Sequence, residues 1–333
     1  MDSERALLEA VYDDPRSDAP REVYADWLTS RSNPLGELIT LQLAKARGRR
    51  VPKSREEALF RERHVGWWSD HPCVIAERPT ALRLDQLERG FPAHYLPNSE
   101  SSPLTSTIGR TGWATVTELT LPTGLADDVL VALLARSPLR SLTWLHGLRP
   151  TSFERVADLN RAVRGVTLFG VDGALPVPGW PALDSLALWL SRPTALDAAL
   201  AVATALVAPP RLVSLELRQV VGGQAGGVSL CRLVEVHRQL GLRRLATQEP
   251  YVKDVTLQRE GDALTLRVKM EGAVHQSIAN MLAELDPSAV QQLEVDLTPG
   301  PRRLETDDAR ARIERYTSAW PKERVKLGWR RKS

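Results

Sequence analysis

Two patterns of hydrophobic and polar positions divide the chain. Near the N-terminus, apolar side chains recur at three- and four-residue spacing, which is typical of amphipathic helices. Further along, a shorter pattern recurs: an apolar residue, two polar or small residues, an apolar residue, one variable residue and another apolar residue. Its last two apolar positions have the period of 2 that places side chains on one face of a strand. We therefore expect helices first and short strands afterwards.

The N-terminal pattern predicts four short helices that form a small bundle over residues 1–75. They are expected from Ser3 to Tyr12, around Val23 to Leu28, from Pro34 to Leu43 and from Ser54 to Trp68. Ser3 and Ser54 are predicted helix caps, and Pro34 is well placed to open the third helix. Glu57, three residues after Ser54, completes a capping-box pattern.

The same segment carries a dense sequence motif. It runs through Leu7-Leu8, Asp14-Pro15, Asp18-Ala19-Pro20-Arg21, Val23-Tyr24-Ala25-Asp26-Trp27-Leu28 and Asn33-Pro34-x-Gly36-Glu37-Leu38-Ile39-x-Leu41-Gln42. These residues resemble the bacterial repeat-companion domain, a family named for its position ahead of repeats, often leucine-rich ones. The resemblance implies no established biochemical activity. We expect the motif acids Asp26 and Glu37 to satisfy helix termini or to pair with Arg21 and Arg31.

The short strand pattern recurs at a regular distance in the rest of the chain. Its copies are Val116-x-x-Leu119-x-Leu121, Leu139-x-x-Leu142-x-Trp144, Val163-x-x-Val166-x-Leu168, Leu183-x-x-Leu186-x-Leu188, Leu212-x-x-Leu215-x-Leu217 and, after a gap, Val290-x-x-Leu293-x-Val295. The central residues of the first five copies are 23, 24, 20 and 29 residues apart. Those steps match the leucine-rich-repeat period. Helices are expected between the strands, at 127–135, 152–162, 194–207 and 228–240.

These patterns predict an α/β protein in which a small N-terminal helical bundle precedes an irregular leucine-rich-repeat-like solenoid with parallel strands and helices. Residues 76–112 would be a linker or N-terminal cap, and residues 113–250 would be the array. Leucine-rich repeats usually place Asn or Cys three residues after the last strand anchor. Here those positions hold Gly124, Gly147, Val171, Ser191 and Val220, so we expect a less regular coil.

The pattern changes beyond Leu245. Alternation at 254–259 and 263–269 around Glu260-Gly261-Asp262 predicts a hairpin. Helices are then expected at 273–285 and 307–319, and strands at 290–297 and 324–329. Residues 251–333 would form distorted C-terminal repeats or a separate α/β cap.

Composition narrows the classes of function. A formal net charge of +3 is too small for a chain that binds nucleic acid through its overall charge. The two cysteines, Cys73 and Cys231, exclude a disulfide framework and a four-cysteine metal site. No transmembrane-length apolar run and no secretion signal are found, so we expect a cytoplasmic protein without a membrane partner.

Two local motifs come closest to a catalytic or metal site. Gly222 to Ser229 has glycine spacing like that of a phosphate-binding loop, but Val228 occupies the place of the essential Lys. His64, His71 and Cys73 make only a weak zinc argument because no matching ligands accompany them. We therefore assign no catalytic residue, metal or cofactor.

Two basic stretches, 45–63 and the tail from Pro321, each carry five more cations than acids. The candidate nucleic-acid contacts in them are Arg49, Arg50, Trp329, Arg330 and Arg331. Solvated helix faces and a frayed terminus explain both stretches more simply.

Among the nine tryptophans, Trp144 fits the strand pattern and is expected in the core. Trp189 alternates away from Leu186 and Leu188, so it is a candidate protein-contact anchor, although core packing or edge cover explains it more simply. We expect a non-catalytic protein-interaction scaffold with an unidentified protein partner. The alternatives are an enzyme or enzyme accessory with a non-local site, for example near His94 or His146, and nucleic-acid binding through the basic stretches.

Overall fold

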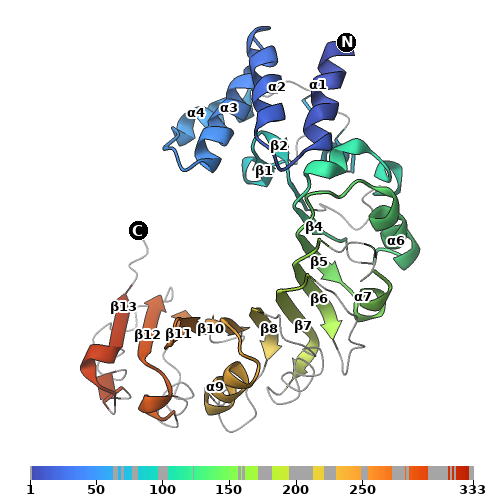
Figure 1. The fold of residues 1–333 in the computed structure, drawn as a ribbon. Coiled ribbons are helices and arrows are strands. Elements are labelled where there is room, and N and C mark those ends of the chain that lie inside the picture. The colour runs from blue at the N-terminus through green and yellow to red at the C-terminus, as the bar shows by residue number, and fades with distance from the viewer. Residues whose placement is uncertain are drawn as a thin grey trace. The chain divides into compact units, whose positions relative to one another are not determined.

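The computed structural model shows a mixed α/β protein with a large, mostly parallel sheet (Figure 1). It describes residues 2–62, 67–68, 71–76, 82–96, 104–122, 124–156, 159, 162–171, 182–194, 213–220, 230–248, 254–271, 282, 285–298, 314–315, 317–318 and 320–329. The chain has two compact units. The first comprises Met1–Leu148, Arg155–Arg164 and Trp180–Ala182, and the second comprises Arg149–Glu154, Gly165–Gly179 and Leu183–Ser333.

The first unit begins with the expected helices. They are α1 (Asp2–Asp13), α2 (Ala19–Thr29), α3 (Pro34–Ala46) and α4 (Lys53–Arg61), followed by the short α5 (Pro72–Ala76). Pro34 opens α3 as predicted, and the Asn33 side chain caps it by accepting a hydrogen bond from the Leu35 N–H at 3.0 Å.

The predicted caps and end of two helices are wrong. Ser3 and Ser54 lie inside α1 and α4, because the helices begin at Asp2 and at Lys53, directly after Pro52. The fourth helix ends at Arg61 rather than Trp68, whose backbone has a left-handed φ of 56°. A left-handed backbone conformation cannot continue a right-handed helix.

The core of the helical bundle includes residues beyond position 75. Its buried side chains extend from Val11 on α1 to Leu82, Leu87, Phe91 and Ala114. Strands β1 (Leu87–Glu88) and β2 (Phe91–Pro92) pair antiparallel and carry Phe91 into this core. The turn between them is tied to α3 because the Gly90 N–H donates to Gln42 Oε1 at 2.7 Å.

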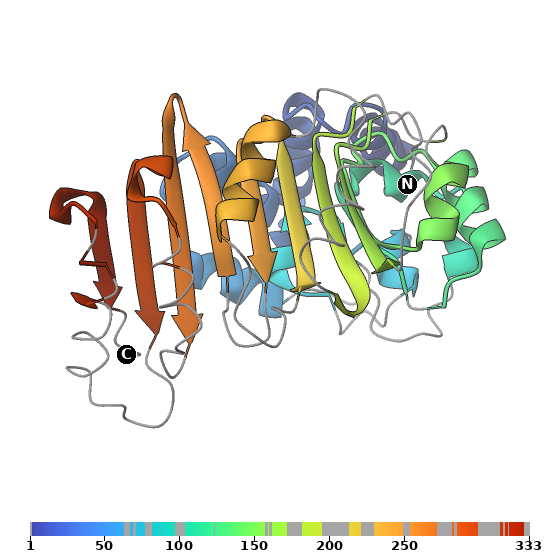
Figure 2. The ribbon, with the colours of Figure 1, turned by 90° about the horizontal axis from the view of Figure 1, so that it is seen from below.

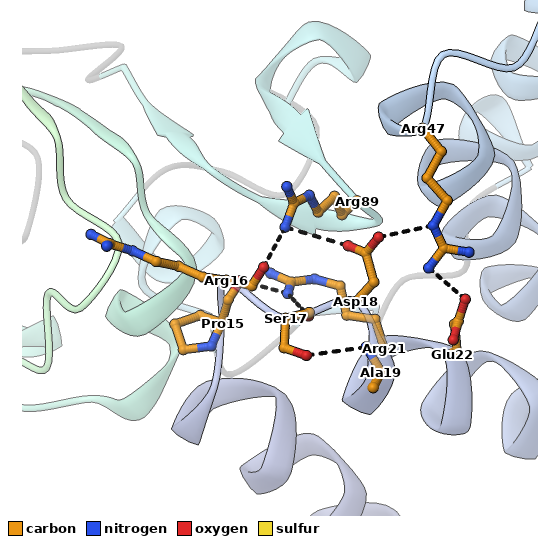
Figure 3. A network of polar contacts seen from close by, with 9 residues as sticks. All are labelled: Pro15, Arg16, Ser17, Asp18, Ala19, Arg21, Glu22, Arg47 and Arg89. Atoms are coloured by element: carbon orange, nitrogen blue, oxygen red, sulfur yellow. Dashed lines mark hydrogen bonds and ion pairs between the residues drawn. The ribbon is translucent and has the colours of Figure 1, made fainter.

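Several motif residues of the N-terminal segment hold this turn and the start of α2 together (Figure 3). The buried Arg21 donates to the carbonyl oxygens of Pro15 and Ser17 at 2.5 and 2.9 Å. Arg47 donates to Asp18 at 3.0 Å, and Arg89 lies 3.4 Å from the other oxygen of the same carboxylate. Burial lowers the pKa of Arg21 to about 10, so the guanidinium is still charged near neutral pH.

The first unit continues into parallel strands. Strands β3 (His94–Tyr95), β4 (Glu118–Thr120) and β5 (Trp144–Leu148) pair in this order, with α6 (Asp127–Arg136) between the last two. Tyr95 pairs with Leu119, and Leu119 pairs with Leu145; all three are buried. Helix α7 (Pro150–Val156) follows β5.

This register corrects one copy of the sequence pattern. Leu142 was predicted to be the strand residue equivalent to Leu119, with Trp144 in the core. The equivalent residue is instead Leu145, and Trp144 is only partly buried, on the other face of β5. Leu142 is fully buried but precedes the strand.

The second unit has eight strands within its described residues. They are β6 (Gly165–Val171), β7 (Ser185–Thr194), β8 (Ser214–Val220), β9 (Arg244–Gln248), β10 (Asp254–Glu260), β11 (Ala263–Glu271), β12 (Gln292–Thr298) and β13 (Val325–Trp329). Their order in the sheet is their order in the chain. Strands β6 to β9 are parallel, as are β11 to β13, whereas β10 is antiparallel to both its neighbours.

The predicted hairpin is therefore confirmed, as is the helix after the glycine-rich segment. That helix, α9 (Leu230–Gln239), packs against β9 and β10 on one face of the strands (Figures 1 and 2). The glycine-rich loop at 222–229 and the helices expected at 194–207, 273–285 and 307–319 lie wholly or largely outside the described residues.

Candidate functional site

Strands β6 to β9 present one apolar and one mixed face. Leu186 and Leu188 on β7, and Leu215 and Leu217 on β8, are almost completely buried. Leu186 and Leu215 are in register with the buried Leu245 on β9, the strand against which α9 packs. The intervening residues point to the opposite face because strand side chains alternate. No helix within the described part of this unit lies on that face (Figure 1). We call it the helix-free face.

An aromatic and charged cluster lies on the helix-free face. It consists of Phe169, Trp189, Glu216, Arg218 and Arg244, which we call the Trp189 patch. Phe169, Trp189 and Arg218 are direct neighbours in register on β6, β7 and β8. The rings of Phe169 and Trp189 have centroids 4.4 Å apart, and the Arg218 Cζ lies 4.8 Å from the Trp189 ring centroid. Trp189 is thus flanked from both sides and remains partly exposed.

The charged half of the Trp189 patch is centred on Glu216. Arg218 Nε lies 2.6 Å from one carboxylate oxygen of Glu216, and Arg244 Nη1 lies 3.7 Å from the other. The Glu216 side chain is 24% exposed, against 35% and 43% for the two arginines. One carboxylate thus holds two guanidinium groups in place from the same and the next strand.

Trp189 is the predicted site residue that the structure places on this face. Its four companions were missed, although the sequence carries a signal for two of them. Phe169, Trp189 and Arg218 each come directly after the last apolar residue of a pattern copy, so they hold equivalent positions. Glu216 and Arg244 have no comparable signal, because their approach depends on the pairing of β8 with β9.

The first unit has a second cluster, around His94 and His146. His94 Nε2 lies 3.0 Å from Glu88 Oε1 and 4.0 Å from Glu118 Oε1, and His146 Nε2 lies 3.9 Å from the other oxygen of Glu118. Trp144 stacks on His146 with an interplanar angle of 10°. Histidines that are 52 positions apart in the sequence thus share one carboxylate across β3, β4 and β5.

The Glu88–His94 contact shifts both titrations. Its hydrogen bond to Glu88 raises the pKa of His94, and the same bond lowers the pKa of Glu88. Such a pair can hold or transfer a proton near neutral pH. Among the residues that the structure describes, however, no three His, Cys, Asp or Glu side chains are arranged to hold a metal ion.

His71 and Cys73, which made the weak zinc argument, have a structural role. His71 Nδ1 accepts a hydrogen bond from the Cys73 N–H at 3.2 Å, so its proton resides on Nε2. Nε2 then donates to Thr115 Oγ1 at 3.0 Å, and this hydroxyl donates to the Pro92 carbonyl at 2.9 Å. Burial lowers the pKa of His71 to about 3, which keeps the ring neutral. His64 lies outside the described residues.

Two arginines of the first basic stretch are paired with acids elsewhere in the bundle. Arg47 pairs with Asp18 and with Glu22, and Arg55 makes two hydrogen bonds to Glu37. Glu37 therefore pairs with Arg55 rather than with Arg21 or Arg31, and its pKa is lowered by that contact. Arg21 is directed instead to carbonyl groups, and Arg31 lies over the Trp27 ring at 3.9 Å.

The described candidate nucleic-acid residues belong to two different units. Arg49 and Arg50 are exposed after the end of α3 in the first unit. Trp329 is the last residue of β13 in the second unit, where its backbone pairs with Leu297. Arg330 and Arg331 lie outside the described residues.

Comparison with known proteins found no similar protein. No protein-family model matches the chain, and neither the curated proteins nor the solved structures include a significant match. None of the helices in the described parts of the chain is both long enough and apolar enough to cross a membrane.

Proposed function

We propose that this protein is a non-catalytic interaction scaffold that binds a protein partner on the helix-free face of a leucine-rich-repeat-like solenoid. The observation that carries the proposal is the Trp189 patch. Tryptophan and arginine dominate the binding energy of protein interfaces when they are held in place by their neighbours. Phe169 and Glu216 provide that support, for Trp189 and Arg218 respectively.

The solenoid part of the proposal is supported by equivalent residues within each unit. In the first unit Thr117 and Glu118 both donate to the Ala93 carbonyl, and in the next strand Thr143 and Trp144 both donate to Thr117. The second unit repeats this arrangement. There Val213 and Ser214 donate to Asp184, and Arg243 and Arg244 donate to Val213. Each strand thus enters the sheet in the same way as its predecessor, which is what a repeat architecture requires.

The experiment compares partner capture from the source cells by the wild-type chain, Trp189→Ala and Trp27→Ala. Trp27 is a matched control because it is also a partly buried tryptophan with an arginine over its ring, but it lies on α2. We expect at least one protein to be lost with Trp189→Ala and kept with Trp27→Ala. Capture that is unchanged by Trp189→Ala, in a variant whose unfolding curve shows that it is folded, would refute the scaffold function.

A second candidate function, an enzyme or enzyme accessory with a non-local site, is favoured by the His94–Glu118–His146 contacts. Two imidazoles beside one carboxylate can serve as general acid and base. The test is a screen of hydrolysis of chromogenic esters and phosphate esters by the wild-type chain and by His94→Gln/His146→Gln. Turnover that is lost in this double variant but kept in Trp189→Ala would favour this function. No turnover by the wild-type chain would count against it.

A further inference from the structure

We propose that the partner segment received by the Trp189 patch is acidic: a stretch of polypeptide whose carboxylates contact Arg218 and Arg244. This inference rests on the proposed function and specifies the chemistry of the partner. It is carried by the charges of the patch and by the way in which the indole ring is covered.

The charges of the patch leave one cation in excess. Arg218 and Arg244 both contact Glu216, so a single carboxylate faces two guanidinium groups. Each guanidinium has five N–H donors in a planar fork and cannot lose its charge under ordinary conditions. Glu216 leaves most of these donors available. A second carboxylate, supplied by a partner, would complete an alternating pattern of two cations and two anions on the sheet surface.

The same arrangement recurs further along the helix-free face. Glu294 on β12 lies 2.7 Å from Arg267 on β11 and 3.7 Å from Lys326 on β13. Like Glu216, Glu294 is 24% exposed, and its two cations are more exposed than it is. Glu260 at the β10–β11 turn is an acid on this face between the two groups. Two separate groups of one carboxylate with two cations favour an extended acidic segment over a single carboxylate.

The contacts that Phe169 and Arg218 make with the Trp189 ring favour a polypeptide over a nucleic acid as the ligand of the patch. Phe169 and Arg218 reach the ring from the strands on either side of β7, so a base could stack on the indole only after displacing one of them. An aliphatic side chain does not need an open face of the indole, because it can pack against the part of the Trp189 ring that remains exposed. An acidic segment that carries an apolar side chain therefore fits both halves of the patch.

The experiment uses the full chain and four fluorescein-labelled probes. Three are peptides of about twelve residues with a central Leu and with flanking positions that are mostly Glu, mostly Gln or mostly Lys; the fourth is an oligothymidylate of similar length. Binding is followed by anisotropy at about 50 mM and about 0.5 M salt. We expect the Glu peptide to bind at least about tenfold more tightly than any other probe at low salt, and this preference to shrink at high salt.

Two charge-reversal variants locate the binding. Arg244→Glu should weaken binding of the Glu peptide by about tenfold or more. Its matched control is Arg243→Glu, which makes the same change of charge at the neighbouring exposed position, directly before β9, and should have little effect. Equal weakening by both variants, tighter binding of another probe, or no binding of the Glu peptide would overturn the acidic-segment proposal.

The outcome separates the two proposals. A partner that is lost with Trp189→Ala but kept with Arg244→Glu leaves the scaffold function standing and refutes the acidic segment. Capture that does not depend on Trp189 refutes the scaffold function, whichever peptide binds.

Discussion

Arg218 and Trp189 occupy paired positions on adjacent parallel strands, and the guanidinium of Arg218 lies over the indole ring at 4.8 Å from its centroid. The two residues are 29 positions apart in the sequence. Their contact therefore depends on the register between β7 and β8. Because Glu216 holds Arg218 from the same strand, the cation is positioned before any partner arrives. Such prior ordering reduces the entropy that is lost on binding.

This contact should be measurable in a double-mutant cycle. We expect Trp189→Ala and Arg218→Ala to show a coupling of about 0.5–1 kcal/mol in the free energy of urea unfolding, the usual size of a cation–π contact at an exposed site. Trp189→Ala combined with Lys326→Ala, a distant cation of the same face, should be additive. A coupling that is no larger for the Arg218 pair than for the Lys326 pair would show that the contact is not formed in solution.

The buried His71 should make the first unit sensitive to acid. Its pKa is about 3 in the folded chain against an ordinary value of 6.5, so the unfolded chain binds the proton first as the pH falls. Stability is then lost progressively from pH 6.5 down to about pH 3, and the loss between pH 7 and pH 5 should be about 2 kcal/mol.

The measurement is urea unfolding, at both pH values, of the wild-type chain and of His71→Asn. The variant has no imidazole to protonate, so it should lose about 2 kcal/mol less than the wild type over the same interval. Burial also lowers the pKa of His237, to about 4, so some acid sensitivity should persist in the variant. An unchanged dependence on pH would contradict the neutral, hydrogen-bonded ring.

The turn at Gly90 should tolerate no side chain. Its φ is +85°, and an added Cβ would lie 2.9 Å from the Cα of Ile39 on α3. A backbone atom cannot move aside as a flexible side chain can, so Gly90→Ala should destabilise the first unit by about 3 kcal/mol or more.

Gly48 is the matched control for this substitution. Its φ is +75°, but an added Cβ would have no atom within 4 Å. Gly48→Ala should therefore cost only the conformational term, about 1 kcal/mol. Thermal unfolding of the two variants distinguishes the effects. Equal losses would mean that the turn does not approach α3 as closely as described.

The Glu88–His94 pair should stabilise the first unit only over a limited pH range. The pKa of His94 is raised from 6.5, so its contribution is fully present below that pH and is lost as the pH rises through the higher folded value. The pKa of Glu88 is lowered from 4.5, so its contribution is lost as the pH falls through the lower folded value.

An NMR titration of the His94 ring tests this pair. We expect a midpoint above 6.5 in the wild-type chain and a lower midpoint in Glu88→Gln. Glu118→Gln should lower it less, because that carboxylate is 4.0 Å away rather than 3.0 Å. If removal of Glu118 has the larger effect, the assignment of the hydrogen bond to Glu88 is wrong.

The errors of the sequence interpretation have identifiable causes. Val23 is one of the apolar residues whose spacing predicts the second helix, but it is 55% exposed, because the buried face of α2 is formed by Arg21, Tyr24, Ala25 and Leu28. The apolar spacing of Leu139-x-x-Leu142-x-Trp144 aligns Leu142 with Leu119, whereas the strand register places Leu145, three positions later, opposite Leu119. A shift by an odd number of residues reverses the face of every side chain in a strand, so the pattern places Trp144 on the wrong face of β5.

The sequence alone determined the local elements: helices at the N-terminus, short strands at intervals of 20 to 30 residues, and the hairpin at Gly261. Local periodicity and turn chemistry suffice for these because they act over a few neighbouring residues. The tertiary structure decided which strands pair and in which register, and hence that Phe169, Trp189, Glu216, Arg218 and Arg244 meet on one face. Register depends on how the buried leucines of successive strands stack after long connections, and no local pattern contains that information.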